Sequence, residues 1–180
     1  MRIIAGSRKG SRIAAPKGLD TRPTGDRVRE AAFNLIGPVD GASVLDLFAG
    51  SGAMGLEALS RGAARVTFVE ADREAAAAIV ANVEKLRLEG ATVLRDDAVR
   101  HLAADASRGR RYDLVLVDPP YRMLAGILPS LATYVPSVLA SEDALVVVES
   151  DAREEPELPL PKRTSRRYGS ARITVFEAPA

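Results

Sequence analysis

A glycine-rich turn between an apolar segment and a helix-forming segment constrains the fold of this chain more than any other feature. Residues 43–47 read Ser-Val-Leu-Asp-Leu, and the turn after them carries Gly50, Gly52 and Gly55. Glycines at these positions let the backbone approach a ligand closely and let the next helix pack against the strand. The pattern predicts a strand, a ligand-binding turn and a helix, which together begin a βαβ unit.

Strand-like and helix-like segments alternate along the rest of the chain. Helices are expected at residues 24–36 (with Thr24 as the cap), 53–60, 72–86 (with Asp72 as the cap), from 98, and near 126–134. Strands are expected at residues 43–47, 65–70, 92–95, 112–117, 144–149, 163–168 and 172–177. This order predicts an α/β fold: a mostly parallel, Rossmann-like seven-stranded sheet with helices on both faces and an antiparallel C-terminal hairpin at one edge.

Basic residues are concentrated at the start of the chain. Residues 1–36 contain eight Lys and Arg against three acids, whereas the whole chain has 25 against 24. We expect residues 1–20 to form a small β-hairpin and basic arm around Gly6–Gly10, and residues 21–180 to form the main domain. A second basic cluster lies near the C-terminus: Lys162, Arg163, Arg166, Arg167 and Arg172. Such patches on a nearly neutral chain favour a polyanionic partner.

The lack of cysteine and the single histidine exclude several classes of site. Without cysteine there is no disulfide scaffold, thiolate zinc site or Cys nucleophile. His101 alone cannot build a His-based metal cluster, so we expect no metal, and we place His101 on a helix surface. No apolar run approaches the roughly 20 residues of a membrane span, and the N-terminus lacks the apolar stretch of a signal peptide. We therefore expect a soluble, cytoplasmic protein without membrane contact, and a monomer.

Two acids discriminate between nucleotide-like ligands. Glu70 ends the second predicted strand, 20 residues after Gly50, where a carboxylate can accept hydrogen bonds from ribose hydroxyls. This arrangement alone permits NAD, FAD or S-adenosylmethionine. Asp46 precedes the turn, where its charge would repel a pyrophosphate but would suit the ammonium group of a bound amino acid. Because S-adenosylmethionine carries that ammonium and no phosphate, Asp46 favours it.

A polar turn follows the fourth predicted strand of the parallel sheet. Residues 118–121 read Asp118-Pro119-Pro120-Tyr121 and come directly after the apolar residues 114–117. In open α/β sheets the ligand crevice lies at the carboxyl ends of the strands. We expect this turn to share the site with the glycine turn.

These motifs carry a family resemblance. Residues 118–121 are similar to the (Asp/Asn)-Pro-Pro-(Tyr/Phe) motif of methyltransferases that act on exocyclic amines of nucleic-acid bases. Together with residues 46–55, they resemble the class I S-adenosylmethionine-dependent methyltransferase fold. The nearer resemblance is to the RsmD family of bacterial 16S rRNA guanine-N2 methyltransferases. It rests on residues 2–6 with Gly10 and Ile13, 22–30, 46–61, 118–121 and 148–150.

The resemblance implies methyl transfer to N2 of a guanine in 16S rRNA, conventionally guanine 966. It implies that Glu70 binds the ribose of the cofactor, and that Asp97 and Ala98 lie by its adenine. The tandem Asp96-Asp97 leaves open which acid faces the adenine, and we favour Asp97. The residues implied at the methionine end are Asp46, Phe48, Ala49, Gly50 and Gly52.

Residue chemistry supports a catalytic role for the Asp-Pro-Pro-Tyr turn. The Asp118 carboxylate and the Pro119 carbonyl can accept hydrogen bonds from a base amine and stabilise positive charge on it. Tyr121 can stack on a base that has left its helical stack. The basic residues expected to hold RNA phosphates without reading sequence are Arg2, Arg8, Lys9, Arg12 and Arg22. Only 4% of residues are aromatic, so we expect recognition of RNA by shape.

Other functions remain open at this point. The same fold and tetrapeptide could methylate adenine N6 in DNA or rRNA. The glycine turn and Glu70 also fit an NAD-dependent oxidoreductase, and the basic arm also fits a non-catalytic rRNA-binding factor. The sequence leaves two further questions: whether the substrate is naked rRNA or an assembling small ribosomal subunit, and whether Glu149 is structural or lines the site.

Overall fold

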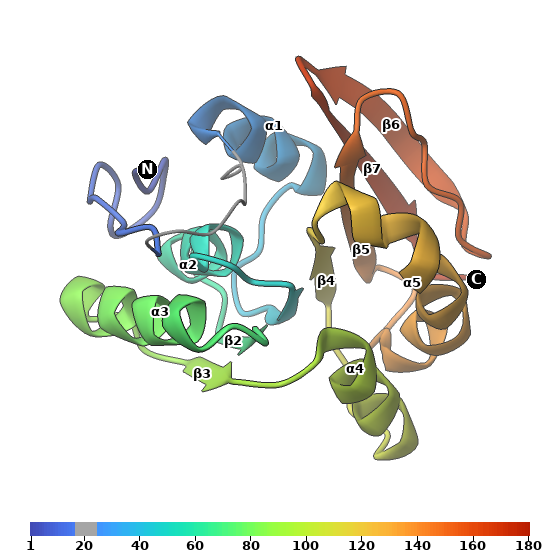
Figure 1. Cartoon of the computed structure of the whole chain (residues 1–180), viewed down its shortest axis with the longest axis horizontal. Helices are drawn as coiled ribbons and strands as arrows, with labels where there is room; N and C mark the ends of the chain where they lie inside the picture. The colour runs from blue at the N-terminus through green and yellow to red at the C-terminus, as the bar shows by residue number, and fades with distance from the viewer. Residues whose placement is uncertain (17–24) are drawn as a thin grey trace.

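A single mixed sheet forms the centre of the molecule. The computed structural model describes residues 1–16 and 25–180. Its strands are β1 (Ser43–Leu47), β2 (Arg65–Val69), β3 (Ala91–Leu94), β4 (Leu114–Val117), β5 (Leu145–Asp151), β6 (Lys162–Tyr168) and β7 (Ala171–Glu177). They lie in the order β3-β2-β1-β4-β5-β7-β6 (Figure 1). Strands β1 to β5 are parallel, and β7 pairs antiparallel with both β5 and β6. The predicted fold class is confirmed.

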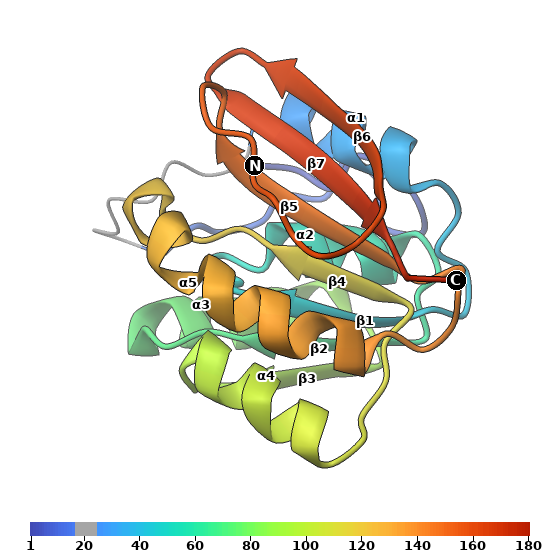
Figure 2. The same cartoon turned by 90° about the vertical axis from the view of Figure 1, so that its right-hand side faces the viewer.

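Helices cover both faces of this sheet. They are α1 (Asp26–Ile36), α2 (Ala53–Ser60), α3 (Arg73–Leu86), α4 (Ala98–Ser107), α5 (Tyr121–Tyr134) and the 3₁₀ helix η1 (Val135–Val138). Figure 2 shows α4 and α5 in front of the sheet and α1 and α2 behind it. Alternate side chains of β1 enter the two separate cores, Val44 on one face and Leu45 on the other. None of the helices in the described ranges is both long enough and apolar enough to cross a membrane.

Most elements lie within two residues of their predicted bounds, but α5 begins five residues before its predicted start. Pro120, with φ −49°, is its N-cap, and Tyr121 is its first residue. Proline fixes φ close to the helical value, so the two prolines lead the chain from β4 straight into a helix. As a result, the Asp-Pro-Pro-Tyr turn includes a helix N-terminus. The predicted cap of α1, Thr24, lies outside the described residues, and α1 has Gly25 as its N-cap.

The described part of the arm, residues 1–16, folds back on itself. One β-bridge joins Arg2 to Arg12, and backbone N–H groups of Ile3 and Ile13 donate to Ser11 and Met1. This pairing is shorter than the two strands that the sequence predicts. The side chains of Ile3 and Ile13 are buried in the same core as α1 and α2, so the arm packs as part of the main domain.

A buried carboxylate fixes this arm to α2. Glu57 is fully buried, and its two oxygens accept hydrogen bonds from the backbone N–H groups of Ile4 (2.8 Å) and Ala5 (3.0 Å). The same carboxylate forms ion pairs with Arg61 at 2.8 Å and with the buried Arg29 at 3.6 Å. Arg29 forms a second ion pair, with Asp26 at 3.0 Å. Glu57 is therefore one buried polar link between the arm and the sheet domain, and Ser60 and Asn82 supply others.

We expect Glu57→Ala to lower the free energy of unfolding by about 3–5 kcal/mol, because two buried backbone donors lose their acceptor and Arg61 and Arg29 lose a nearby carboxylate, while Arg29 keeps its ion pair with Asp26. Urea denaturation followed by circular dichroism measures the loss. Glu84→Ala, on the exposed face of α3, is the matched control and should change it by less than about 0.5 kcal/mol. Equal effects of the two substitutions would contradict the role given to Glu57.

Candidate active site

Three acids meet where the central strands end. Asp46 is the fourth residue of β1, Glu70 directly follows β2, and Asp118 directly follows β4. Strand β1 pairs with β2 on one side and with β4 on the other, so these strand ends are neighbours. We call Asp46, Glu70 and Asp118 the three-acid cluster. The sequence assigned each of them to the site, and the sheet order brings them together.

Asp46 is the most perturbed acid of the cluster. It is 2% exposed, and its Oδ2 accepts a hydrogen bond from the Gly55 N–H at 3.0 Å. Burial raises the pKa of Asp46 to about 8, and the charges of Asp118 and Glu70 act in the same direction. A buried acid next to two other acids gains strongly from a bound cation. Asp46 is therefore well placed to meet a ligand's ammonium group.

Glu70 holds the glycine turn in shape. One of its carboxylate oxygens accepts from the Gly50 N–H and the other from the Asp72 N–H, both at 2.8 Å. The turn is tightened by a bond from Gly52 N–H to the Ala49 carbonyl at 2.7 Å. Phe48, with φ +59°, adopts a left-handed conformation that non-glycine residues rarely adopt. The turn is thus held in one conformation by hydrogen bonds, and Phe48 carries backbone strain of the kind found at ligand sites.

The glycines of the turn differ in what surrounds them. A Cβ added to Gly55 would lie 2.3 Å from the Phe68 ring, and one on Gly52 would lie 3.1 Å from Ile79. These two glycines allow the helix to pack. A Cβ on Gly50, by contrast, would meet nothing within 4 Å. The structure therefore has open space at Gly50, in the turn that follows the strand with the buried Asp46.

Gly50→Ala tests that space. Gly50 has φ +56°, so an alanine there should cost about 1 kcal/mol of stability through backbone strain. If the space holds the cofactor, the added methyl group should also weaken S-adenosylmethionine binding at least tenfold, as measured by calorimetry. Gly109→Ala is the matched control, because Gly109 has φ +69°, equally open surroundings and a place in the loop before β4. Equal affinities of the two variants would show that the space does not take the cofactor.

The tandem acids after β3 have different environments. Asp96 forms an ion pair with Arg100 and accepts from the Asp97 N–H at 2.8 Å. Asp97 caps α4, since its Oδ1 accepts from the Arg100 N–H at 2.8 Å, and it is the more exposed of the two acids. Ala98 is buried as the first residue of α4. Asp97 is therefore the more accessible acid for a ligand.

His101 is buried, and its expected place on a helix surface is wrong. Its side chain is 11% exposed, and its Nε2 lies 3.1 Å from Oδ2 of Asp105. The same oxygen accepts from the Tyr112 hydroxyl at 2.5 Å. Asp105 comes one helical turn after His101 and Tyr112 from the next strand region, so the histidine packs inward against polar partners. His101 therefore helps to pack α4 against the rest of the domain.

The Asp-Pro-Pro-Tyr turn lies next to a further acid. The hydroxyl of Tyr121 donates to Oε1 of Glu149 at 3.4 Å. Burial, the charges of Glu149 and Asp118 and this hydrogen bond raise the pKa of Tyr121 well above its usual value. Glu149 is 7% exposed on β5. The sequence left its role undecided, and the signals for it were an acid that interrupts an apolar strand and its place in residues 148–150, which carry part of the family resemblance.

Comparison with known proteins places this chain in a family. The family described as "Conserved hypothetical protein 95" matches residues 1–177. The chain is 40% identical to the putative rRNA methyltransferase YlbH of Bacillus subtilis, over 98% of both chains. It is also 40% identical to ribosomal RNA small subunit methyltransferase D of Escherichia coli, over 84% of this chain and 75% of that protein. The chain belongs to the RsmD family.

Solved structures confirm the fold of this RsmD-family chain. The putative methyltransferase yhhF from Escherichia coli superposes with a TM-score of 0.86 at 36% identity, over 100% of this chain and 98% of that one. SMU.776, a putative methyltransferase complexed with SAH, has a TM-score of 0.71 over 84% of this chain and 48% of that one. Because the two sequences are only 16% identical, this similarity is evidence for a common fold and for nothing more. The predictions of a methyltransferase fold and of S-adenosylmethionine as cofactor agree with these relatives.

The basic residues of the arm have unequal surroundings. Arg2, Lys9 and Arg12 are exposed. The Arg8 guanidinium instead donates to the carbonyls of Leu86 and Arg87 (3.1 Å to the latter), at the C-terminal end of α3, where a positive charge is favourable. Arg22 lies outside the described residues. Lys9 and Arg12 thus present their charge to solvent, Arg2 is exposed but lies 3.8 Å from Asp26, and Arg8 has a structural contact.

The second basic cluster of this RsmD-family chain is partly neutralised. Lys162 and Arg172 both pair with Glu155, at 2.8 and 3.3 Å, and Arg163 pairs with Glu177 at 3.0 Å. Arg172 is also largely buried. Arg166 and Arg167 remain exposed on β6. The cluster therefore presents less charge to a polyanion than the sequence suggests.

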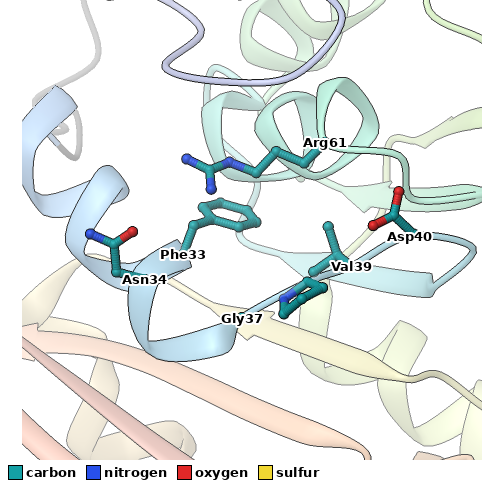
Figure 3. Close-up of a pocket in the computed structure, with 7 residues that line it drawn as sticks. Phe33, Asn34, Gly37, Val39, Asp40 and Arg61 are labelled. Carbon is teal, nitrogen blue, oxygen red and sulfur yellow. The ribbon is translucent and has the colours of Figure 1, made fainter.

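A surface hollow between α1 and α2 lies away from the three-acid cluster. Figure 3 shows Arg61 over the ring of Phe33, with Asn34, Gly37, Val39 and Asp40 around them. These residues come from α1, the loop before β1 and the end of α2, and so lie at the amino end of β1. The Arg61 guanidinium stacks 4.7 Å from the ring centroid and pairs with Glu57. This hollow is part of the packing between α1 and α2.

Proposed function

We propose that this RsmD-family chain transfers a methyl group from S-adenosylmethionine to the exocyclic N2 of a guanine in 16S rRNA, conventionally guanine 966, during small-subunit biogenesis. The observation that carries the proposal is the position of the Asp-Pro-Pro-Tyr turn. Asp118 follows β4 beside the end of β1, where the buried Asp46 and the glycine turn lie. A base amine held by this turn is next to the place that fits the cofactor. The names of the relatives support the rRNA as substrate.

The chain's own residues hold the cofactor from end to end. S-adenosylmethionine supplies a methyl group that is electrophilic because it is bound to a sulfonium. Asp46 attracts the ammonium group, and the open backbone at Gly50 leaves room for the methionine end. Glu70, which already orders the turn, accepts hydrogen bonds from the ribose hydroxyls. The exposed Asp97 accepts from the amine of the adenine, with Ala98 packed beside it.

The Asp-Pro-Pro-Tyr turn orients and activates the acceptor amine. The lone pair of guanine N2 is delocalised into the ring, so this nitrogen is a poor nucleophile. Hydrogen bonds from the amine to the Asp118 carboxylate and to the Pro119 carbonyl favour a more pyramidal nitrogen and stabilise the positive charge that develops on it. Pro119 lacks an N–H, so no donor competes with the amine there. Tyr121 stacks on the extruded base.

The exposed arm supplies phosphate contacts. Arg2, Lys9 and Arg12 can bind the RNA backbone without reading sequence, and Arg22 is proposed to join them. Arg8 can contribute only by leaving or sharing its contact with the end of α3. We propose that the partner is 16S rRNA, either naked or in an assembling small subunit.

Nucleoside mass spectrometry of 16S rRNA from a strain that lacks this gene tests the proposal. We expect the loss of one N2-methylguanosine, restored by the wild-type gene and not by Asp118→Ala. Loss of an N6-methyladenosine instead would support adenine methylation. An unchanged methylation pattern would contradict the proposal.

A further inference from the structure

A second carboxylate lies beside the catalytic turn. Val117 pairs with Val148 at the end of the β4–β5 register, and Asp118 and Glu149 are the next residues along the two chains. Both carboxylates act electrostatically on the Tyr121 hydroxyl, so both lie near it. Glu149 is 7% exposed, and such a buried acid needs polar partners. The Tyr121 hydroxyl, 3.4 Å from Oε1, is one of them. The proposed stacking residue and this acid are thus directly connected.

The bond between Tyr121 and Glu149 orients the carboxylate. Because the pKa of Tyr121 is raised, the phenol keeps its proton and acts as the donor. An ionised carboxylate accepts up to about four hydrogen bonds and donates none. Tyr121 uses one of these positions. In its ionised form, Glu149 would offer acceptors, and only acceptors, to the base that Tyr121 would stack on.

The two purines differ in what they offer to a pair of carboxylates. In guanine, the N2 amine is adjacent to the N1–H, so two neighbouring groups on the same edge are donors. In adenine, the N6 amine is adjacent to the bare N1, which is an acceptor. One carboxylate at the amine suits either base, but a second acceptor beside it suits guanine alone. A site that binds a donor in this way rejects an analogue that lacks it, because the buried acceptor is then unpaired.

We propose that Glu149 is a specificity-determining residue that accepts the N1–H of the target guanine while Asp118 accepts from its N2 amine. This inference rests on the proposed function and adds the reason for selecting guanine over adenine. Tyr121 has a second role in it, because its hydroxyl positions the Glu149 carboxylate. A substrate without the N1–H should therefore lose the interaction with Glu149, just as the wild-type substrate loses it when Glu149 is replaced.

The test compares guanine with 2-aminopurine at the target position of 16S rRNA in reconstituted small subunits. 2-Aminopurine keeps the amine but has a bare N1. We expect the wild type to prefer guanine in kcat/KM by about 100-fold or more. In Glu149→Gln, the amide can donate to the bare N1, so this preference should fall at least tenfold. Glu154→Gln, an exposed acid in the loop after β5, is the matched control and should keep the wild-type preference.

The outcomes separate this inference from the proposed function. If Glu149→Gln lowers methylation of both bases equally, Glu149 is structural and the inference is overturned. If the wild type methylates neither base, the proposed function fails. Tyr121→Phe keeps the stacking ring and loses the hydroxyl, so it should also lower the preference for guanine. This second variant decides the question if Glu149→Gln does not fold, and an unchanged preference would then overturn the inference.

Discussion

Replacement of Asp118 by alanine is expected to lower kcat for rRNA methylation by about 10²–10³-fold, the usual effect of losing a hydrogen-bonding group that stabilises charge in a transition state. Affinity for the cofactor should stay within about threefold, because Asp46, Glu70 and the glycine turn remain. Transfer of labelled methyl groups to small ribosomal subunits measures the rate, and calorimetry measures the affinity.

Two further variants sharpen the result for Asp118. Asp118→Asn keeps an acceptor without the charge, so its rate should lie between those of the wild type and of Asp118→Ala. Asp143→Ala removes an exposed acid in the loop before β5 and should have no effect. A wild-type rate for Asp118→Ala would remove the catalytic role that we propose for this residue.

Asp46→Asn is expected to stabilise the free protein and to weaken cofactor binding. The amide oxygen can still accept from the Gly55 N–H, while the cost of burying a charge beside Glu70 and Asp118 disappears. We expect the free energy of unfolding at pH 8 to rise by on the order of 1–3 kcal/mol. Affinity for S-adenosylhomocysteine, which carries the same ammonium group, should fall by 10- to 100-fold. Asp40→Asn, in the exposed loop before β1, is the control for both measurements.

The sign of the pH dependence follows from the raised pKa of Asp46. The folded protein holds this proton up to about pH 8, whereas the unfolded chain releases it near pH 4. The stabilising contribution of the proton is complete below pH 4 and is lost as the pH rises towards 8. Hence the stabilising effect of Asp46→Asn should grow between pH 5 and pH 8, as measured by thermal unfolding. An effect that shrinks over this range would contradict the assignment.

The site was predictable where chain order alone sets the geometry. Asp46, Glu70 and Asp118 each lie at or directly after the end of a predicted strand, and parallel strands bring their carboxyl ends to one edge of a sheet. The glycine turn is largely local as well, since Gly55 is required by Phe68 of the same βαβ unit and Gly52 by Ile79 of the helix that follows it. The start of α5 was misjudged because proline is weak as a helix former inside a helix but well suited to its first turn.

Contacts between distant parts of the chain were not predictable. Glu57 bonds to Ile4 and Ala5, more than 50 residues away, and nothing in the local sequence marks it as buried. Arg8 was counted as free basic charge, although it caps a helix that ends at Leu86. His101 looked solvent-exposed because its partners Asp105 and Tyr112 are themselves polar. The contacts of Glu57 and Arg8 follow from tertiary packing, whereas His101 and Asp105 are one helical turn apart and were overlooked as a local pair.

The most direct test of the proposed function is methyl transfer by the purified chain. Small subunits from a strain that lacks the gene would be incubated with the protein and methyl-labelled S-adenosylmethionine, and the modified nucleoside would be identified and mapped by mass spectrometry. We predict one N2-methylguanosine per 16S rRNA, and no incorporation into subunits from the parent strain. Labelled N6-methyladenosine, or no label at all, would contradict the account.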